Sequence, residues 1–136
     1  MNFTIIHQEK KLPSFYSNAI KEYHKRLQRY CKIQLISCSS DAAIAKKMAA
    51  SAYIIGISVN TSTYTSVDFA HYLSQLGISG NSRLTLIINP SDAILNQCNA
   101  HIALSALVNE PGVILTLLFE QIYRAYRINL NQAYHK

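Results

Sequence analysis

The sequence predicts a single α/β domain with a mainly parallel sheet and helices on both faces. Short apolar runs alternate with amphipathic stretches along the 136 residues, which is the pattern of strands connected by helices. Two of these runs, residues 53–59 and 84–88, are almost wholly apolar, as expected for strands buried on both faces. The chain has no internal repeat and no linker, so residues 1–136 are expected to form one domain.

The first half of the chain predicts two strands and two helices in alternation. Residues 3–6 are an apolar run that suits a first strand. Apolar residues then recur at spacings of three and four from residue 14 to about residue 30, which indicates a helix. A second strand is expected at residues 33–38, and residues 39–41 cap a short helix that reaches about Ala50.

The second half continues the alternation and ends in the longest helix. Its strands are expected at residues 53–59, 84–88 and 102–108. Ser66 is expected to cap a helix that stops at the glycine-containing loop 77–82, and a short helix follows the turn at 89–92 as far as about Cys98. Pro111, whose fixed φ suits a first helical turn, begins a helix that runs to about Ile128.

The last helix is apolar nearly all round between Val113 and Phe119. A helix on the surface of a domain has one apolar stripe, so this helix needs cover on more than one side. A small domain has little material for that purpose. Burial against a second copy in a two-fold dimer is therefore expected.

The composition disfavours membrane, metal and disulfide classes. The chain has no run of about 18 apolar residues, and residues 1–6 lack the basic stretch of a signal peptide. Cys31, Cys38 and Cys98 show no Cys-x-x-Cys spacing, which argues against a zinc site or a disulfide framework. Reduced thiols, no bound metal and a cytoplasmic location are the expectation.

Basic residues are concentrated near the start of the chain. The net charge is +6 and the pI is about 9.3, which favours a polyanionic partner such as nucleic acid. Seven of the basic and two of the acidic residues lie within residues 1–36, so most of the excess belongs to the first loop and first helix. Lys21, Lys25, Arg26 and Arg29 are the candidate RNA-binding residues; a merely solvated helix face is the alternative.

The C-terminal segment carries the most specific pattern. Residues 120–125 read Glu-Gln-Ile-Tyr-Arg-Ala, and the chain ends in Tyr134, His135 and Lys136. This combination resembles the ribosomal RNA large subunit methyltransferase H family, small SPOUT enzymes that methylate N3 of a pseudouridine in 23S rRNA. The first helix and the Leu-Ser-Ala-Leu run at residues 104–107 match the family as well.

The resemblance implies a fold, a cofactor and partners. The fold would be a parallel α/β sheet whose C-terminal part forms a trefoil knot, a feature too rare to propose from periodicity. The cofactor would be S-adenosylmethionine, bound in the knot beside the partner subunit of a homodimer. The substrate would be 23S rRNA in the large ribosomal subunit or the 70S ribosome.

The resemblance also makes His135, Arg124 and Tyr134 the candidate catalytic residues. Methylation of a ring N3–H requires loss of the proton, for which His135 is a suitable base or a group that orients the base. Arg124 would hold a phosphate or a uracil carbonyl, and Tyr134 would stack on a base. The structural alternatives are a mobile surface histidine and a cation at a helix C-terminus.

The cofactor pocket implied by the resemblance departs from the family pattern. Its candidate residues are Ile57, Pro90, Leu104, Ser105, Ala106, Leu107, Val108 and Asn109. The family has a glycine-rich loop where this chain has Asn89, Pro90 and Ala93, and Pro90 also removes a backbone N–H. The alternative function is therefore a degenerate homologue that binds RNA or the ribosome as a dimer without methyl transfer. A third alternative is an α/β protein that shares only the helix motif.

Overall fold

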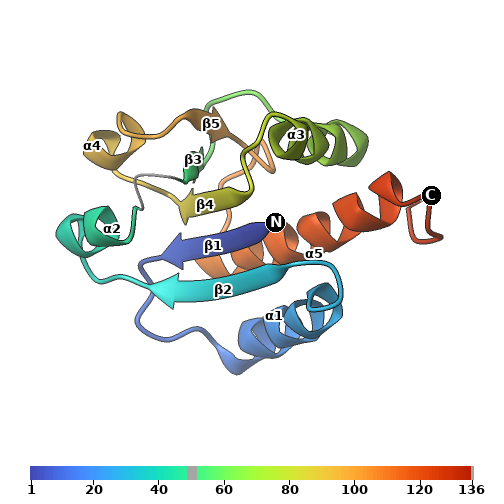
Figure 1. The fold of residues 1–136 in the computed structure, drawn as a ribbon. Helices are drawn as coiled ribbons and strands as arrows, with labels where there is room; N and C mark the ends of the chain where they lie inside the picture. Colours follow the sequence, from blue (N-terminus) through green and yellow to red (C-terminus); the bar gives the residue numbers. More distant parts are fainter. Residues whose placement is uncertain (49–51, 136) are drawn as a thin grey trace.

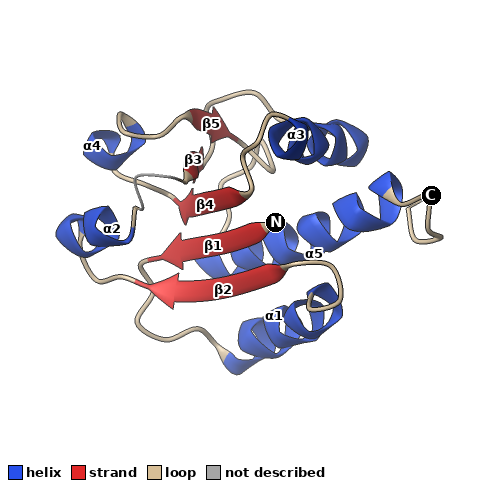
Figure 2. Ribbon diagram, viewed as in Figure 1, coloured by secondary structure: helices blue, strands red, loops and turns tan. Residues whose placement is uncertain are grey.

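The computed structural model describes residues 1–48 and 52–135 and shows a five-stranded, wholly parallel sheet in the order β2-β1-β4-β3-β5 (Figure 1). Strands and helices alternate along the chain, as Figure 2 shows by colour. The strands are β1 Asn2–His7, β2 Lys32–Ser37, β3 Tyr53–Ile57, β4 Arg83–Ile88 and β5 Ala100–Ile102. The helices are α1 Ser14–Leu27, α2 Asp41–Lys47, α3 Ser66–Ile78, α4 Asp92–Leu95 and α5 Pro111–Asn129.

Helices cover both faces of the sheet, which confirms the predicted α/β class. Successive strand residues point to opposite faces, so each strand supplies two cores. Ile5 and Leu86 belong to the larger core, beneath α1, α3 and α5. Ile6 and Ile87 belong to a smaller core that includes Ile44 of α2 and the one buried residue of α4.

Helix α5 begins at Pro111, as predicted, and packs between α1 and α3. Its inward residues are buried against the sheet and these two helices: Gly112, Ile114, Leu115, Leu118, Phe119, Ile122, Tyr123 and Ala125. Most of the apolar residues of α5 are therefore buried within their own chain. Val113 and Leu117 are only partly covered, on the outer side of the helix.

The strand predicted at residues 102–108 is wrong, because β5 has already ended at Ile102. The following segment forms local hydrogen bonds in place of ladder bonds. Ser105 Oγ accepts from the Leu107 amide at 3.0 Å, and Asn109 Nδ2 donates to the Leu107 carbonyl at 3.0 Å. Such side-chain bonds compete with strand formation. Leu107 and Val108 lie in this segment and are 72% and 86% exposed.

Helix ends differ from the prediction by a few residues. Thr65, not Ser66, caps α3, since its side chain accepts from the Asp68 amide at 3.1 Å. That helix continues through Gly77 to Ile78, whereas α1 stops at Leu27 and α4 stops at Leu95, before the predicted ends. Helix α2 ends at Lys47, and the predicted end near Ala50 lies outside the described residues. None of the helices in the described part of the chain is long and apolar enough to cross a membrane.

Two glycines give a matched test of packing. A Cβ at Gly56 in β3 would meet Leu95 Cδ1 at 2.6 Å and Pro90 Cγ at 3.2 Å, so Gly56→Val should destabilise the protein by about 1–3 kcal/mol. Gly77, near the end of α3, has only Met1 within 4 Å, so Gly77→Ala should stabilise by about 0.5–1 kcal/mol. Urea unfolding of both variants measures the difference. Equal stability of the two would contradict this packing at the end of β3.

Candidate functional site

An ion pair on the side of α5 that faces α1 forms the centre of the candidate site. Glu120 and Arg124 lie one turn apart, and the guanidinium Nε and Nη2 donate to Glu120 Oε1 at 3.0 and 2.7 Å. The hydrogen bond to Glu120 raises the pKa of Arg124 above its already high ordinary value. Arg124 is therefore a permanent cation held in one orientation by its own helix.

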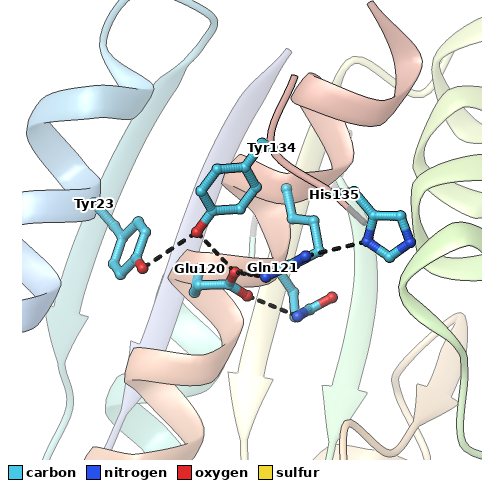
Figure 3. A network of polar contacts seen from close by, with 6 residues as sticks. Tyr23, Glu120, Gln121, Tyr134 and His135 are labelled. Atoms are coloured by element: carbon cyan, nitrogen blue, oxygen red, sulfur yellow. Dashed lines mark hydrogen bonds and ion pairs between the residues drawn. The ribbon is translucent and has the colours of Figure 1, made fainter. Parts of the chain in front are cut away.

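The C-terminal tail folds back over this pair (Figure 3). The Tyr134 hydroxyl donates to Glu120 Oε1 at 3.0 Å, so the Tyr23 hydroxyl, 3.4 Å away, is the donor to Tyr134. The Tyr134 ring lies 4.8 Å from the Arg124 guanidinium carbon and stands edge-on to Tyr123 at 5.0 Å between centroids. Burial, followed by the bonds to Tyr23 and Glu120, raises the pKa of Tyr134, so its hydroxyl stays protonated at neutral pH.

His135 contacts the same arginine. Its Nδ1 lies 3.1 Å from Arg124 Nη1. A guanidinium only donates, so Nδ1 is the acceptor and the ring carries its proton on Nε2. The structure thus brings the three candidate catalytic residues into one cluster.

The tail is fixed by contacts along its length. Asn131 takes a left-handed conformation with φ 53°, which turns the chain back after α5. Arg127 Nη2 then donates to the Ala133 carbonyl at 2.7 Å, and Tyr30 donates to Gln132 Oε1 at 2.6 Å. These contacts argue against a frayed tail with a mobile histidine. Lys136, the last residue of the tail motif, lies outside the described residues.

Three residues of the cluster were not predicted as site residues: Glu120, Gln121 and Tyr23. Glu120 is its hub, accepting from Arg124, Tyr134 and Gln121. The Glu-x-x-x-Arg spacing is the signal that indicates this pair, since residues four apart face each other on a helix. Tyr23 comes from α1, and only the fold brings it to the tail.

The predicted cofactor residues line a cleft only in part. Ile57, Leu104, Ser105, Leu107 and Asn109 lie around it, beyond the carboxyl ends of β3 and β5. That edge is where ligands bind in open α/β sheets. The cleft also includes Ser58, Val59, Ile114 and Leu117, which were not predicted. Its volume is ≈ 10 Å³, room for about one water molecule.

The other predicted cofactor residues, Pro90, Ala106 and Val108, are not among the residues that line this cleft. Pro90 packs beside Gly56 of β3 instead. The preceding Asn89 has φ 47°, a left-handed conformation that asparagine tolerates better than most residues, and its amide donates to the Ile57 carbonyl at 2.7 Å. The turn after β4 thus forms without glycine, and the Asn89 amide is hydrogen-bonded within the protein.

The cleft has one further polar contact that the sequence did not indicate. Ser58 Oγ lies 2.5 Å from Nε2 of His101 on β5. His101 was assigned no role from the sequence, and the contact joins the ends of two neighbouring strands. Within residues 1–48 and 52–135, no three His, Cys, Asp or Glu side chains are grouped so as to hold a metal ion.

Among the candidate RNA-binding residues, Lys21, Lys25 and Arg26 lie on α1, and Arg29 lies in the turn that follows it. Lys21, Lys25 and Arg29 are exposed. Arg26 is exposed as well, but its Nε donates to Glu22 at 3.0 Å and its guanidinium carbon lies 5.6 Å from the centre of the Tyr23 ring. Tyr23 connects this helix to the tail cluster, so the basic surface adjoins the candidate site.

The cleft and the tail cluster lie at different heights on α5. Arg124 follows Ile114 and Leu117 of the cleft by ten and seven residues, which is about 15 and 10 Å along a helix. A hollow between α1 and α5 runs beside both, lined by Tyr16, Tyr23, Val113 and Leu117 among others.

The chain is a parallel α/β domain with a cleft at the carboxyl ends of its strands and a polar cluster on its last helix. It belongs to the SPOUT methyltransferases, because residues 1–135 match the family described as "Predicted SPOUT methyltransferase". Within that family the chain is similar to proteins named ribosomal RNA large subunit methyltransferase H. The protein "Ribosomal RNA large subunit methyltransferase H 1" of Thermoanaerobacter sp. (strain X514) is 34% identical over 136 residues, covering all of both chains. The proteins of Clostridium tetani and Clostridium novyi are each 31% identical over 159 aligned residues, again covering both chains fully. The resemblance stated from the sequence is confirmed.

Proposed function

We propose that this protein is an S-adenosylmethionine-dependent methyltransferase that modifies N3 of a pseudouridine in 23S rRNA. The observation that carries the proposal is the ordered cluster of Arg124, Tyr134 and His135 around Glu120. The names of the full-length relatives support a ribosomal RNA of the large subunit as the substrate. Such an enzyme works in the cytoplasm on the large subunit or the assembled ribosome.

The cluster suits the handling of a uracil-type base. His135 presents Nε2–H as a donor, which orients a ring carbonyl. Removal of the N3 proton as the methyl group arrives requires an acceptor. In place of the carbonyl contact, His135 serves this purpose when the substrate has taken Arg124 away from it and Nδ1 faces N3. Arg124 then contacts a phosphate or carbonyl oxygen, and the Tyr134 ring offers a surface for base stacking.

In this proposal the cleft opens to admit S-adenosylmethionine, because its volume of ≈ 10 Å³ holds about one water molecule. Bound there, the cofactor supplies the electrophilic methyl group. Ile57 and Leu104 offer apolar walls, and Asn109 offers a polar side chain near the start of α5. The exposed Leu107 and Val108 lie on the segment between β5 and α5, and we propose that this segment is the one that moves outward to widen the cleft.

The protein acts as a homodimer in this proposal. Ile114 and Leu117 of the cleft precede Arg124 by ten and seven residues, about 15 and 10 Å along α5, and in this proposal the tail of the partner, not that of the same chain, meets the methyl donor. A second copy seated against the outer side of α5 brings its own tail to the first protomer's cleft. The threading of the C-terminal segment as a trefoil knot is part of the same proposal and rests on the family.

Two observations favour the second function, a dimer that binds RNA or the ribosome without transferring methyl groups. The cleft has almost no free volume, and Pro90 supplies no N–H at the turn after β4. The methyltransferase is expected to bind S-adenosylmethionine, and the binding dimer is expected not to bind it.

Calorimetric titration with S-adenosylmethionine separates the two functions. We expect binding weaker than in relatives with a glycine-rich loop, by about tenfold to a hundredfold, since one lost hydrogen bond to a buried polar group costs roughly 1–3 kcal/mol. Large ribosomal subunits from cells lacking the native enzyme are then added with methyl-labelled cofactor. Label in 23S rRNA supports the enzyme. Absence of both binding and label, with ribosome binding intact, supports the binding dimer.

A further inference from the structure

The sheet has a polar patch on the face that carries α2 and α4. Residues on this face of β2, β1 and β4 form rows through the strand register. The first row is Lys32, Asn2 and Arg83, and the second row is Gln34, Thr4 and Thr85. The third row, which holds Ile6, is apolar. All the polar side chains that begin these three strands therefore lie on one face.

The short helices explain why this half of the face stays open. Helices α2 and α4 span Asp41–Lys47 and Asp92–Leu95 and pack on the apolar residues around Ile6. Figure 1 shows both helices beside the arrowheads of the strands, away from the N-terminal ends. Two adjoining hollows of ≈ 390 and ≈ 280 Å³ lie over the polar rows, and both are lined by Asn2, Thr4 and Gln34.

Cations line the two hollows. Lys32 borders one hollow, and Lys47, from the end of α2, borders the other together with Arg83. All three side chains belong to exposed residues, and the described residues that line the hollows include no aspartate or glutamate. Gln34 Nε2 donates to Thr4 Oγ1 at 3.0 Å, which orders the floor between the cations.

We infer that this polar patch is a second RNA-binding surface, which holds backbone phosphates of rRNA on the face of the sheet opposite α5 and the tail. Lys32 and Arg83 lie on strands separated by β1, so their backbones are about 10 Å apart across the sheet. Cations over a floor of hydroxyl and amide groups match phosphate and sugar oxygens and read no base sequence. The choice of RNA as the polyanion rests on the proposed function.

The test compares salt dependence of RNA binding between charge variants. The double variant Lys32→Gln/Lys47→Gln is titrated into large ribosomal subunits and into a fluorescent RNA duplex at several salt concentrations. Affinity should fall about tenfold, and the slope of log affinity against log salt should decrease by about one to two, as expected for two lost phosphate contacts. Lys32→Arg/Lys47→Arg keeps the charges and should restore the wild-type values.

Lys10→Gln/Lys11→Gln removes the same charge from an exposed loop at the other end of β1 and is the matched control. An equal loss of affinity in this control would show an effect of net charge alone and overturn the inference. The inference would also be overturned if the patch bound inorganic phosphate saturably but the Lys32→Gln/Lys47→Gln variant kept the wild-type affinity for RNA. At saturating ribosome concentrations the patch variant should transfer methyl groups at the wild-type rate. If the wild-type protein itself transfers no methyl groups, that result counts against the proposed function and not against this inference.

Discussion

His135→Ala and Arg124→Ala should each lower the rate of methyl transfer by about 10²- to 10⁴-fold while the protein stays folded. For His135→Ala, this loss is the usual contribution of a positioned proton-transfer group to the rate. Arg124 bridges Glu120 and His135, so its removal frees both side chains at once. Neither side chain is part of the buried core, because His135 is exposed and Arg124 is only partly buried.

Two measurements and one control variant make this expectation specific. Single-turnover transfer of labelled methyl groups to unmodified large subunits gives the rate, and thermal unfolding shows whether the fold is kept. His71→Ala, at an exposed histidine of α3, is the matched control and should transfer at the wild-type rate. Incorporation that survives both His135→Ala and Arg124→Ala would show that the tail cluster is structural.

Glu120→Gln distinguishes positioning from catalysis within the same cluster. The amide keeps the size of the side chain but loses the charge that holds Arg124 Nε and Nη2. Since Glu120 acts through Arg124 and Tyr134, we expect a smaller loss of rate than in Arg124→Ala and an altered pH dependence of transfer. An unchanged rate and pH profile would mean that Arg124 is oriented by the substrate instead.

The sequence predicted the sheet, the order of elements and the last helix because each depends on local patterns. The apolar run of β4 and the proline at the start of α5 are such patterns. The run at residues 102–108 is equally apolar and is mostly loop. Its partner β3 ends at Ile57, and the side chains of Ser105 and Asn109 bond locally. Pairing partners are set by the fold, so no window of sequence contains that information.

The candidate site shows the same division. Arg124, Tyr134 and His135 could be found because they stand in one motif near the chain end. Tyr23 could not, since it lies 111 positions from Tyr134 in sequence and meets it only when α1 packs against α5. Pro90 was placed at the cofactor by the resemblance, yet here it fills the space over Gly56.

Leu118→Asp should abolish folding altogether. Leu118 is fully buried in its own protomer. An ionised carboxylate there has no partner, and an uncompensated buried charge costs several kcal/mol, a large part of the roughly 5–15 kcal/mol that keeps a domain folded. This leucine therefore reports on the core of the single chain and gives no information about a dimer.

Val113→Asp, on the same helix, should leave the fold intact and separate the proposed dimer. Val113 is 36% exposed and lines the hollow between α1 and α5. An aspartate in the first turn of α5 suits the helix dipole, so the helix itself is not weakened. In a dimer built on this side, the same carboxylate is desolvated at the interface, which disfavours association.

Sedimentation equilibrium at micromolar concentration should show a wild-type dimer and a folded Val113→Asp monomer. A wild-type protein that sediments as a monomer would exclude the proposed dimer, and a Val113→Asp dimer would place its interface elsewhere on the chain.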